Sequence, residues 1–270
     1  MKRLIVLEWT KFRKNTVMQL LMLFFFLFLP ACMYFVSLLP DIDLPSFLPN
    51  KDTFFQFPSV WEYLGYAGNW IVFFFIGVIA IYLVTIEVSN KTMRQSIING
   101  MTRNEFFASK LLSIIVFSLV ATLYYSLLST IIGFFNTEDA TLAMAFDNDW
   151  AMGRFFLMSL SYTVFAMFLA YLFRKAGLAV FFYVSYIMII EPLIRLYLIE
   201  KFTKASWTRY FPMNSVEDLM PMPAFKYANA IPNDIDFAFL LDFKEATVLS
   251  LIYCALFLGI SYYMFIKRDI

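Results

Sequence analysis

The chain has 270 residues, of which 61% are hydrophobic and only 15% are charged, and its mean hydropathy is +0.72. A soluble globular domain does not have this composition, so we expect a polytopic membrane protein. The net charge of +1 says little about partners, because in a membrane protein the sidedness of the charges carries the information.

The sequence contains no histidine, and its two cysteines, Cys32 and Cys254, both lie inside apolar runs. Without histidine the chain lacks the commonest metal ligand and the usual general base, which excludes zinc hydrolases and Ser/His or Cys/His nucleophile systems. It also lacks a G-x-x-x-x-G-K-[ST] phosphate loop, so we expect neither an enzyme nor a nucleotide cofactor in this chain. The cysteines are expected to pack in the bundle rather than to form a disulfide.

Residues 1–15 predict an amphipathic helix that lies flat on the cytoplasmic surface of the membrane. At about 100° per residue, apolar and polar side chains fall on opposite faces, and Glu8 lies near the edge of the apolar face. A signal-peptide n-region is the alternative, but such regions are rarely this long or this amphipathic. The apolar face holds Leu4, Ile5, Trp9 and Phe12, and the polar face holds Thr10, Lys11, Arg13 and Lys14.

Six apolar stretches are each long enough to cross a hydrocarbon core of about 30 Å at about 1.5 Å per residue. They cover residues 17–39, 67–86, 111–135, 154–173, 176–199 and 247–266. Lys and Arg concentrate at both termini, in the loop 87–110 and in the turn between the fourth and fifth stretches, whereas the loops 40–66 and 136–153 together contain one basic residue, Lys51. By the positive-inside rule, both termini are expected in the cytoplasm.

The cytoplasmic loop 87–110 is predicted to form a short helix, a tight turn and the start of a second helix. Thr102 and Glu105 have the S/T-x-x-E spacing of a capping box, which predicts that the second helix starts there. Gly100 stands where a helix usually ends in the left-handed conformation.

The short helix of this loop is expected from Asn90 to Ile98, with Ser89 or Asn90 as its cap. Met93, Ile97 and Ile98 form an apolar strip on it, beside Lys91, Arg94 and Gln95. Such a helix lies across a surface. A loop that only anchors the two neighbouring spans at the interface has the same pattern and stays an alternative.

The order of Glu87, Thr92, Arg103, Phe107 and Lys110 resembles the cytoplasmic loop of type-2 ATP-binding-cassette (ABC) permeases, the membrane subunits of bacterial exporters of the bacitracin-resistance and sodium-export types. In that family a Glu at the end of the second span is followed five residues later by Thr, and a later Arg is followed seven residues on by Lys. Both spacings are kept here, although the family's usual Pro before the Arg is absent.

The resemblance implies an all-α polytopic membrane protein with the type-2 ABC exporter fold, in which one domain consists of an N-terminal elbow helix and six transmembrane helices. The amphipathic N-terminus and the basic tail at Lys267-Arg268 are similar to that family too. The implied function is a permease subunit that exports a substrate across the bacterial cytoplasmic membrane. The implied partners are two ABC ATP-binding subunits, which hold ATP and magnesium, a second permease chain, identical or homologous, and membrane lipid, with no nucleic acid.

The resemblance also implies that the loop 87–110 couples the permease to the ATPase, with its short helix seated in a groove of that subunit. Polar contacts are expected from Glu87, Arg103 and Lys110, and apolar contacts from Met93 and Ile97. The coupling residues are therefore expected to be Glu87, Thr92, Met93, Arg94, Ile97, Arg103, Phe107 and Lys110.

The fifth apolar stretch contains Glu191, Pro192 and Arg195. A lone charge at the bilayer centre costs roughly 2.5 to 3.5 kcal/mol, and Glu191 and Arg195 share a helix face, so they are expected to pair or to face protein and water. Pro192 frees a carbonyl one turn earlier and can kink the helix. The three residues are candidates for a transport pathway, and a salt bridge that orients the span is the alternative.

Two other functions stay open. A secondary transporter would use Glu191 and Arg195 as its buried charges, whereas a membrane assembly protein would transport nothing. Residues 200–246 are rich in Pro, Met and aromatic residues and are expected to form an interfacial or re-entrant segment on the outside. The cargo stays open, because 34 phenylalanines suit an amphipathic substrate and a lipid-facing surface alike.

Overall fold

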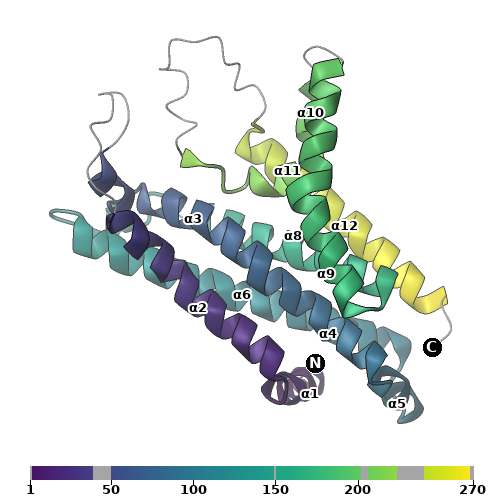
Figure 1. Ribbon diagram of the computed structural model, residues 1–270. Helices are drawn as coiled ribbons and strands as arrows, with labels where there is room; N and C mark the ends of the chain where they lie inside the picture. The colour runs from purple at the N-terminus through teal and green to yellow at the C-terminus, as the bar shows by residue number, and fades with distance from the viewer. Residues whose placement is uncertain (1, 39–49, 149, 202–205, 224–239, 268–270) are drawn as a thin grey trace.

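The computed structural model of the protein describes residues 2–38, 50–148, 150–201, 206–223 and 240–267. Within these ranges the chain is helical and has no strand, and six helices are long and apolar enough to cross a membrane (Figure 1). The predicted all-α, multi-pass membrane protein is therefore confirmed.

Two of the spans are built from two helices each, joined without a break by a π-helical turn. The second span joins α3 to α4 through η2, and the fifth joins α9 to α10 through η3. In chain order the spans are α2 (Thr16–Ser37), α3 (Val60–Ile71) with η2 (Val72–Gly77) and α4 (Val78–Ser89), α6 (Arg103–Asn136), α8 (Trp150–Phe173), α9 (Ala176–Ser185) with η3 (Tyr186–Ile190) and α10 (Glu191–Lys201), and α12 (Phe243–Lys267).

Shorter helices lie at the two ends of the bundle. They are α1 (Lys2–Arg13), η1 (Lys51–Phe55), α5 (Thr92–Ile98), α7 (Leu142–Ala145), η4 (Ser206–Tyr210) and α11 (Pro212–Glu217). α1 and α5 lie at the same end as the last turns of α12, whereas α10 and α11 extend toward the opposite end (Figure 1). The guanidinium of Arg103 donates a hydrogen bond of 2.5 Å to the carbonyl of Ile266, which fixes the start of α6 to the end of α12.

The helices extend beyond several of the predicted span limits. The second span begins at Val60 and not at residue 67, and Trp61 in its first turn is fully buried and donates its indole N–H to the carbonyl of Ala145 at 3.0 Å. The third span begins at Arg103 and not at residue 111, because the capping box at Thr102 starts the helix there. Residues 60–66, predicted as loop, are therefore a helical extension of the second span, whereas the helix predicted to start at Thr102 runs into the third span as expected.

The central helix of the bundle is α8, which packs against α12, α4 and α6. Tyr125 of α6 and Phe155 of α8 stack with ring centroids 4.1 Å apart. The hydroxyl of Ser161 donates to the carbonyl of Leu157, one turn earlier, so a polar group inside the bundle is satisfied locally, as an apolar medium requires. Cys254 faces this hydroxyl at 3.2 Å and is a free cysteine, as predicted.

Candidate functional site

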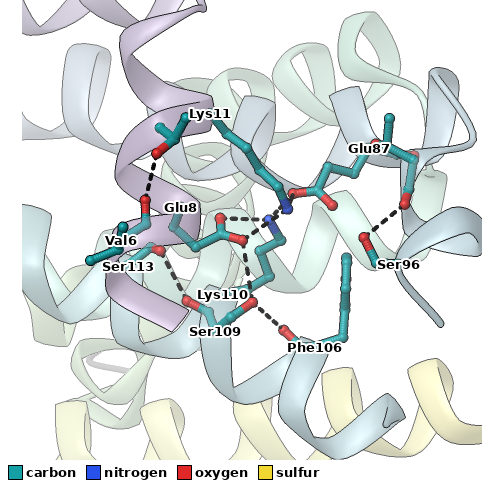
Figure 2. A network of polar contacts seen from close by, with 11 residues as sticks. Val6, Glu8, Lys11, Glu87, Ser96, Phe106, Ser109, Lys110 and Ser113 are labelled. Carbon is teal, nitrogen blue, oxygen red and sulfur yellow. Dashed lines mark hydrogen bonds and ion pairs between the residues drawn. The ribbon is translucent and has the colours of Figure 1, made fainter. Parts of the chain in front are cut away.

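Four charged side chains from three helices meet at the end of the bundle that carries α1 and α5. Glu8 and Lys11 are three positions apart on α1 and so point the same way, Glu87 lies in the last turn of α4, and Lys110 lies near the start of α6. Figure 2 shows the two lysines reaching in between the two carboxylates. We refer to these four residues as the charge cluster.

Lys110 is the centre of the charge cluster. Its side chain is 0% exposed, and its ammonium lies 2.7 Å from the carboxylate of Glu8 and pairs directly with the carboxylate of Glu87. The ring of Phe106 lies 5.1 Å from the same ammonium and covers it on another side. One buried cation therefore joins α1, α4 and α6.

Lys11 makes a second bridge between the same two carboxylates. Its ammonium lies 3.1 Å from Glu8 and 2.9 Å from Glu87, and its side chain is 34% exposed. Burial on its own would raise the pKa of Glu8, but Lys110 and Lys11 outweigh it, so the pKa of Glu8 lies below its usual value. Burial would lower the pKa of Lys11, but Glu8 and Glu87 outweigh it, so the pKa of Lys11 lies above its usual value.

The charge cluster fixes geometry more than it adds stability. Transfer of charges out of water costs several kcal/mol per ion, and the pairing repays this cost only where the geometry is good. Removal of one partner leaves the others buried and uncompensated, which is strongly destabilising. With two acids and two lysines in contact, the cluster can hold α1 against α4 and α6, and the three helices are expected to move as one unit.

The chain between α4 and α6 folds largely as the sequence predicts. The hydroxyl of Thr102 accepts from the amide of Glu105 while the Glu105 carboxylate accepts from the amide of Thr102, so the predicted capping box is confirmed. Gly100 has φ +96°, in the left-handed region where only glycine is unstrained, as predicted.

The predicted cap of the short helix is wrong. The helix α5 begins at Thr92 after Lys91, which has φ 55°, and neither Ser89 nor Asn90 caps it. The reason is that α4 continues through Ser89, so Asn90 ends that helix instead of beginning the next one. The hydroxyl of Thr92 reaches back 3.4 Å to the carbonyl of Glu87, which accounts for the spacing of five between these two residues.

Three of the residues expected to contact a partner do not face the exterior. Glu87 and Lys110 are buried in the charge cluster, and Met93 is 5% exposed against the hydrophobic core. On α5 the exposed residues are Arg94, Gln95 and Ile98, of which Ile98 is 76% exposed, while Ile97 is half-buried. The apolar residue that α5 presents is therefore Ile98 and not Met93.

The other two expected residues face neighbouring helices. Arg103 is half-buried and bonds to the end of α12 at Ile266. Phe107 is buried, and its ring lies 5.7 Å from that of Tyr171 and 5.3 Å from that of Tyr262. Arg103, Phe107 and Lys110 thus attach the first turns of α6 to the rest of the bundle.

The sequence reasoning did not assign a role to two members of the charge cluster, Glu8 and Lys11. The one signal for Glu8 was its position near the edge of the apolar face of the amphipathic helix, where an acid has no reason to lie unless it meets a cation. Lys11 lay on the predicted polar face and carried no such signal. Their partners are 102 and 76 positions away, a separation that no local pattern reveals.

A second polar site lies toward the opposite end of the bundle. Glu191 is 1% exposed, and its carboxylate accepts hydrogen bonds from the backbone amides of Met213 at 3.1 Å and Asn214 at 2.7 Å. These amides belong to the first turn of α11, which has no intrahelical acceptor for them. Glu191 therefore caps α11 from another helix.

The two other candidates of the fifth span take different places. The structure has no ion pair between Glu191 and Arg195 in the residues it describes, and Arg195 is half-buried. Pro192 is the second residue of α10 and lies two positions after the end of the π-helical turn η3, so the wider turn directly precedes the region of the residue that lacks an amide donor. The helix continues through this turn, so it changes its winding without being interrupted.

Two further acids lie at the C-terminal end of α11, with Glu217 as its last residue and Asp218 directly after it. Burial raises the pKa of Glu217 to about 7, with Glu191 adding to the effect and Arg195 opposing it. Burial likewise raises the pKa of Asp218 to about 6, against the opposing hydrogen bonds from Leu241 and Asn214. Both acids therefore titrate near neutral pH.

A family model described as a protein of unknown function (DUF2705) matches residues 46–270. The match begins after α2, so it includes Glu87, Lys110 and Glu191 but not the helix that carries Glu8 and Lys11. No curated protein matches the chain.

Proposed function

Because the chain belongs to the DUF2705 family of proteins of unknown function, we propose its role from its own residues: it is the membrane-spanning permease subunit of an ABC transporter of the bacterial cytoplasmic membrane. In this proposal it exports a substrate with energy from a separate ATP-binding subunit. The observation that carries the proposal is α5, a short helix with an exposed face, placed between the second and third spans and joined to both by tight turns.

The exposed face of α5 suits a partner surface. Ile98 is apolar and 76% exposed, and Arg94 is exposed one turn earlier. An apolar anchor beside a cation is a common composition for the centre of a protein interface. The partner would be an ABC ATP-binding subunit, which holds ATP and magnesium, in two copies against two permease chains.

The charge cluster gives the proposed coupling its rigidity. A push on α5 reaches α4 through the turn at Lys91 and α6 through the cap at Thr102. Because Lys110 ties α6 to α4 and to α1, these helices would shift as one body and not bend separately. Glu87 and Lys110 therefore act inside the permease in this proposal, behind the surface that meets the ATPase.

Purification from the native membrane in mild detergent tests the proposal. We expect a stoichiometric nucleotide-binding subunit to co-elute and the sample to hydrolyse ATP. Arg94→Glu combined with Ile98→Asp is expected to remove that subunit. Lys175→Glu, which changes an exposed lysine in the turn between α8 and α9, and Ile98→Val are the matched controls and should retain it.

The alternatives predict other outcomes of the same experiment. If the chain elutes alone and no ATP is hydrolysed, a secondary transporter built on Glu191 and Arg195 becomes the better reading. Against that reading, the carboxylate of Glu191 already accepts two backbone amides, which is the environment of a structural cap more than of a proton carrier. Co-elution of an ATPase without any substrate movement would favour an assembly role.

A further inference from the structure

A groove of about 900 Å³ opens beside the charge cluster, between α1, α2, α4 and α6. Its polar lining, which includes Glu8, Lys11, Lys14 and Glu87, lies at the end where α1 crosses the bundle. Deeper along α2, α4 and α6 the lining is apolar, with residues such as Met22, Phe26 and Val116. The lining of the groove therefore changes from charged to apolar along its length, which suits an amphipathic molecule with a charged head and an apolar chain.

Phe26, which lines the apolar part of the groove, packs against Tyr124 of α6. The rings of Phe26 and Tyr124 lie 4.7 Å apart, and the Tyr124 hydroxyl donates to the carbonyl of Phe26 at 2.7 Å. From Thr16 at the mouth to Phe26 is ten residues of α2, or about 15 Å at about 1.5 Å per residue. That depth is about half of a hydrocarbon core of about 30 Å, so the groove spans a single leaflet.

The mouth of the groove favours a negative charge. Lys14 is exposed, and no ion partner for its ammonium occurs in the part of the chain that the structure describes. The two carboxylates of the charge cluster are already paired with Lys110 and Lys11. With Lys14 included, three positive charges face two negative charges here. The first amides of α2, at Thr16 and Val17, point out of the positive end of a long helix.

We propose that this groove is a binding site for one anionic phospholipid of the leaflet that adjoins α1, with its phosphate at Lys14 and an acyl chain laid along α2 toward Phe26. The depth of the groove is that of about one leaflet, and the positive charge at its mouth suits a phosphate. The volume of the groove lies within the range of about 300 to 1,000 Å³ that is usual for small-molecule sites. The bound lipid would lie against Lys11 and Glu87, so it would fill the space beside the charge cluster. This inference is independent of an ATPase partner.

Native mass spectrometry of the full chain in detergent, titrated with dioleoyl-phosphatidylglycerol, tests the site. We expect a first lipid to bind at least tenfold more tightly than dioleoyl-phosphatidylcholine. Lys14→Glu should weaken that first binding at least tenfold, while Lys175→Glu, the same change on an exposed lysine in the α8–α9 turn, should alter it less than twofold. Equal effects of the two variants would overturn the proposal in favour of general charge attraction.

A second pair of variants tests the acyl-chain part of the groove. Val116→Trp places a large ring in the groove, whereas Leu251→Trp places the same ring on an exposed face of α12 that does not line it. We expect only Val116→Trp to abolish the tight first binding. Met22→Trp serves if Val116→Trp does not fold. Tight binding that survives in a folded groove-filling variant would show that the lipid binds elsewhere.

Discussion

The ammonium of Lys110 lies 2.7 Å from the carboxylate of Glu8, although 102 positions separate them in the chain. This pair attaches the amphipathic helix α1 to the first turns of α6, the longest transmembrane helix described. Because Lys110 also pairs with Glu87, one buried charge connects three helices.

Replacement of this buried cation should destabilise the protein strongly. Lys110→Ala leaves the carboxylates of Glu8 and Glu87 buried with Lys11 alone, and loss of one partner of a buried pair typically costs about 3 to 5 kcal/mol. We expect a clear fall in the thermal unfolding temperature of the purified protein. Lys175→Ala, at an exposed position, should change stability by no more than about 0.5 kcal/mol. Similar unfolding temperatures for the two variants would contradict the central role of Lys110.

The charge cluster should give stability a plateau between acid and alkaline limits. The pKa of Glu8 lies below its usual 4.5, so its contribution is complete above pH 4.5 and disappears as the pH falls through the folded-state pKa. The pKa of Lys11 lies above its usual 10.5, so its contribution is complete below pH 10.5 and disappears as the pH rises through the folded-state pKa.

Unfolding temperatures measured from pH 3 to pH 11 check this prediction. Other acids also contribute to any loss of stability at low pH. The informative quantity is therefore the difference in unfolding temperature between the wild type and Glu8→Gln. That difference should be largest on the plateau and shrink at low pH. A difference that stays constant across the range would mean that Glu8 is not held ionised by its lysine partners.

The sequence predicts most of the fold and only part of the site, for physical reasons. The number of spans follows from hydrophobic length, and the capping box at Thr102 and the left-handed Gly100 follow from local backbone rules, so all of these could be predicted. The burial of Met93 could not, because a short helix with apolar residues on one side can turn that side toward its own bundle or toward a partner. The choice depends on contacts between distant segments.

The same limit applies to Glu191. Its spacing of four from Arg195 predicts a pair on one helix, and this pattern is all that the local sequence contains. In the structure the first turn of α11, more than twenty positions away in the chain, lies beside Glu191. Two backbone amides of this turn donate hydrogen bonds to the Glu191 carboxylate. A competing partner from a distant helix end is not visible in any local spacing.

The cap of α11 by Glu191 can be tested by hydrogen exchange. Hydrogen bonds to a charged group contribute about 1.5 to 3 kcal/mol, so Glu191→Ala should speed exchange of the Met213 and Asn214 amides roughly ten- to hundredfold. Glu191→Gln keeps one acceptor oxygen and should give a smaller increase. Glu138→Ala, which removes an exposed acid, is the control. Unchanged exchange in Glu191→Ala would exclude the cap.

The segment around α11 should lose local stability as the pH rises toward 8, opposite in sign to the effect of Glu8. The pKa of Glu217 is raised to about 7 and that of Asp218 to about 6, so the folded state favours their protonated forms. An acid with a raised folded-state pKa contributes stability below its unfolded value, and that contribution decreases as the pH rises through the folded value. The window therefore lies between about pH 5 and pH 7, where Glu8 and Lys11 keep their charges.

Hydrogen exchange of residues 212–217 at pH 5.5 and pH 8, corrected for the intrinsic pH dependence of exchange, measures this change. We expect faster corrected exchange at pH 8 in the wild type and a smaller difference in Glu217→Gln and Asp218→Asn. Glu138→Gln should behave as the wild type does, because that acid is exposed. If Glu217→Gln keeps the full pH dependence, burial of Glu217 is not its cause, and Asp218→Asn then tests whether the remaining acid accounts for it.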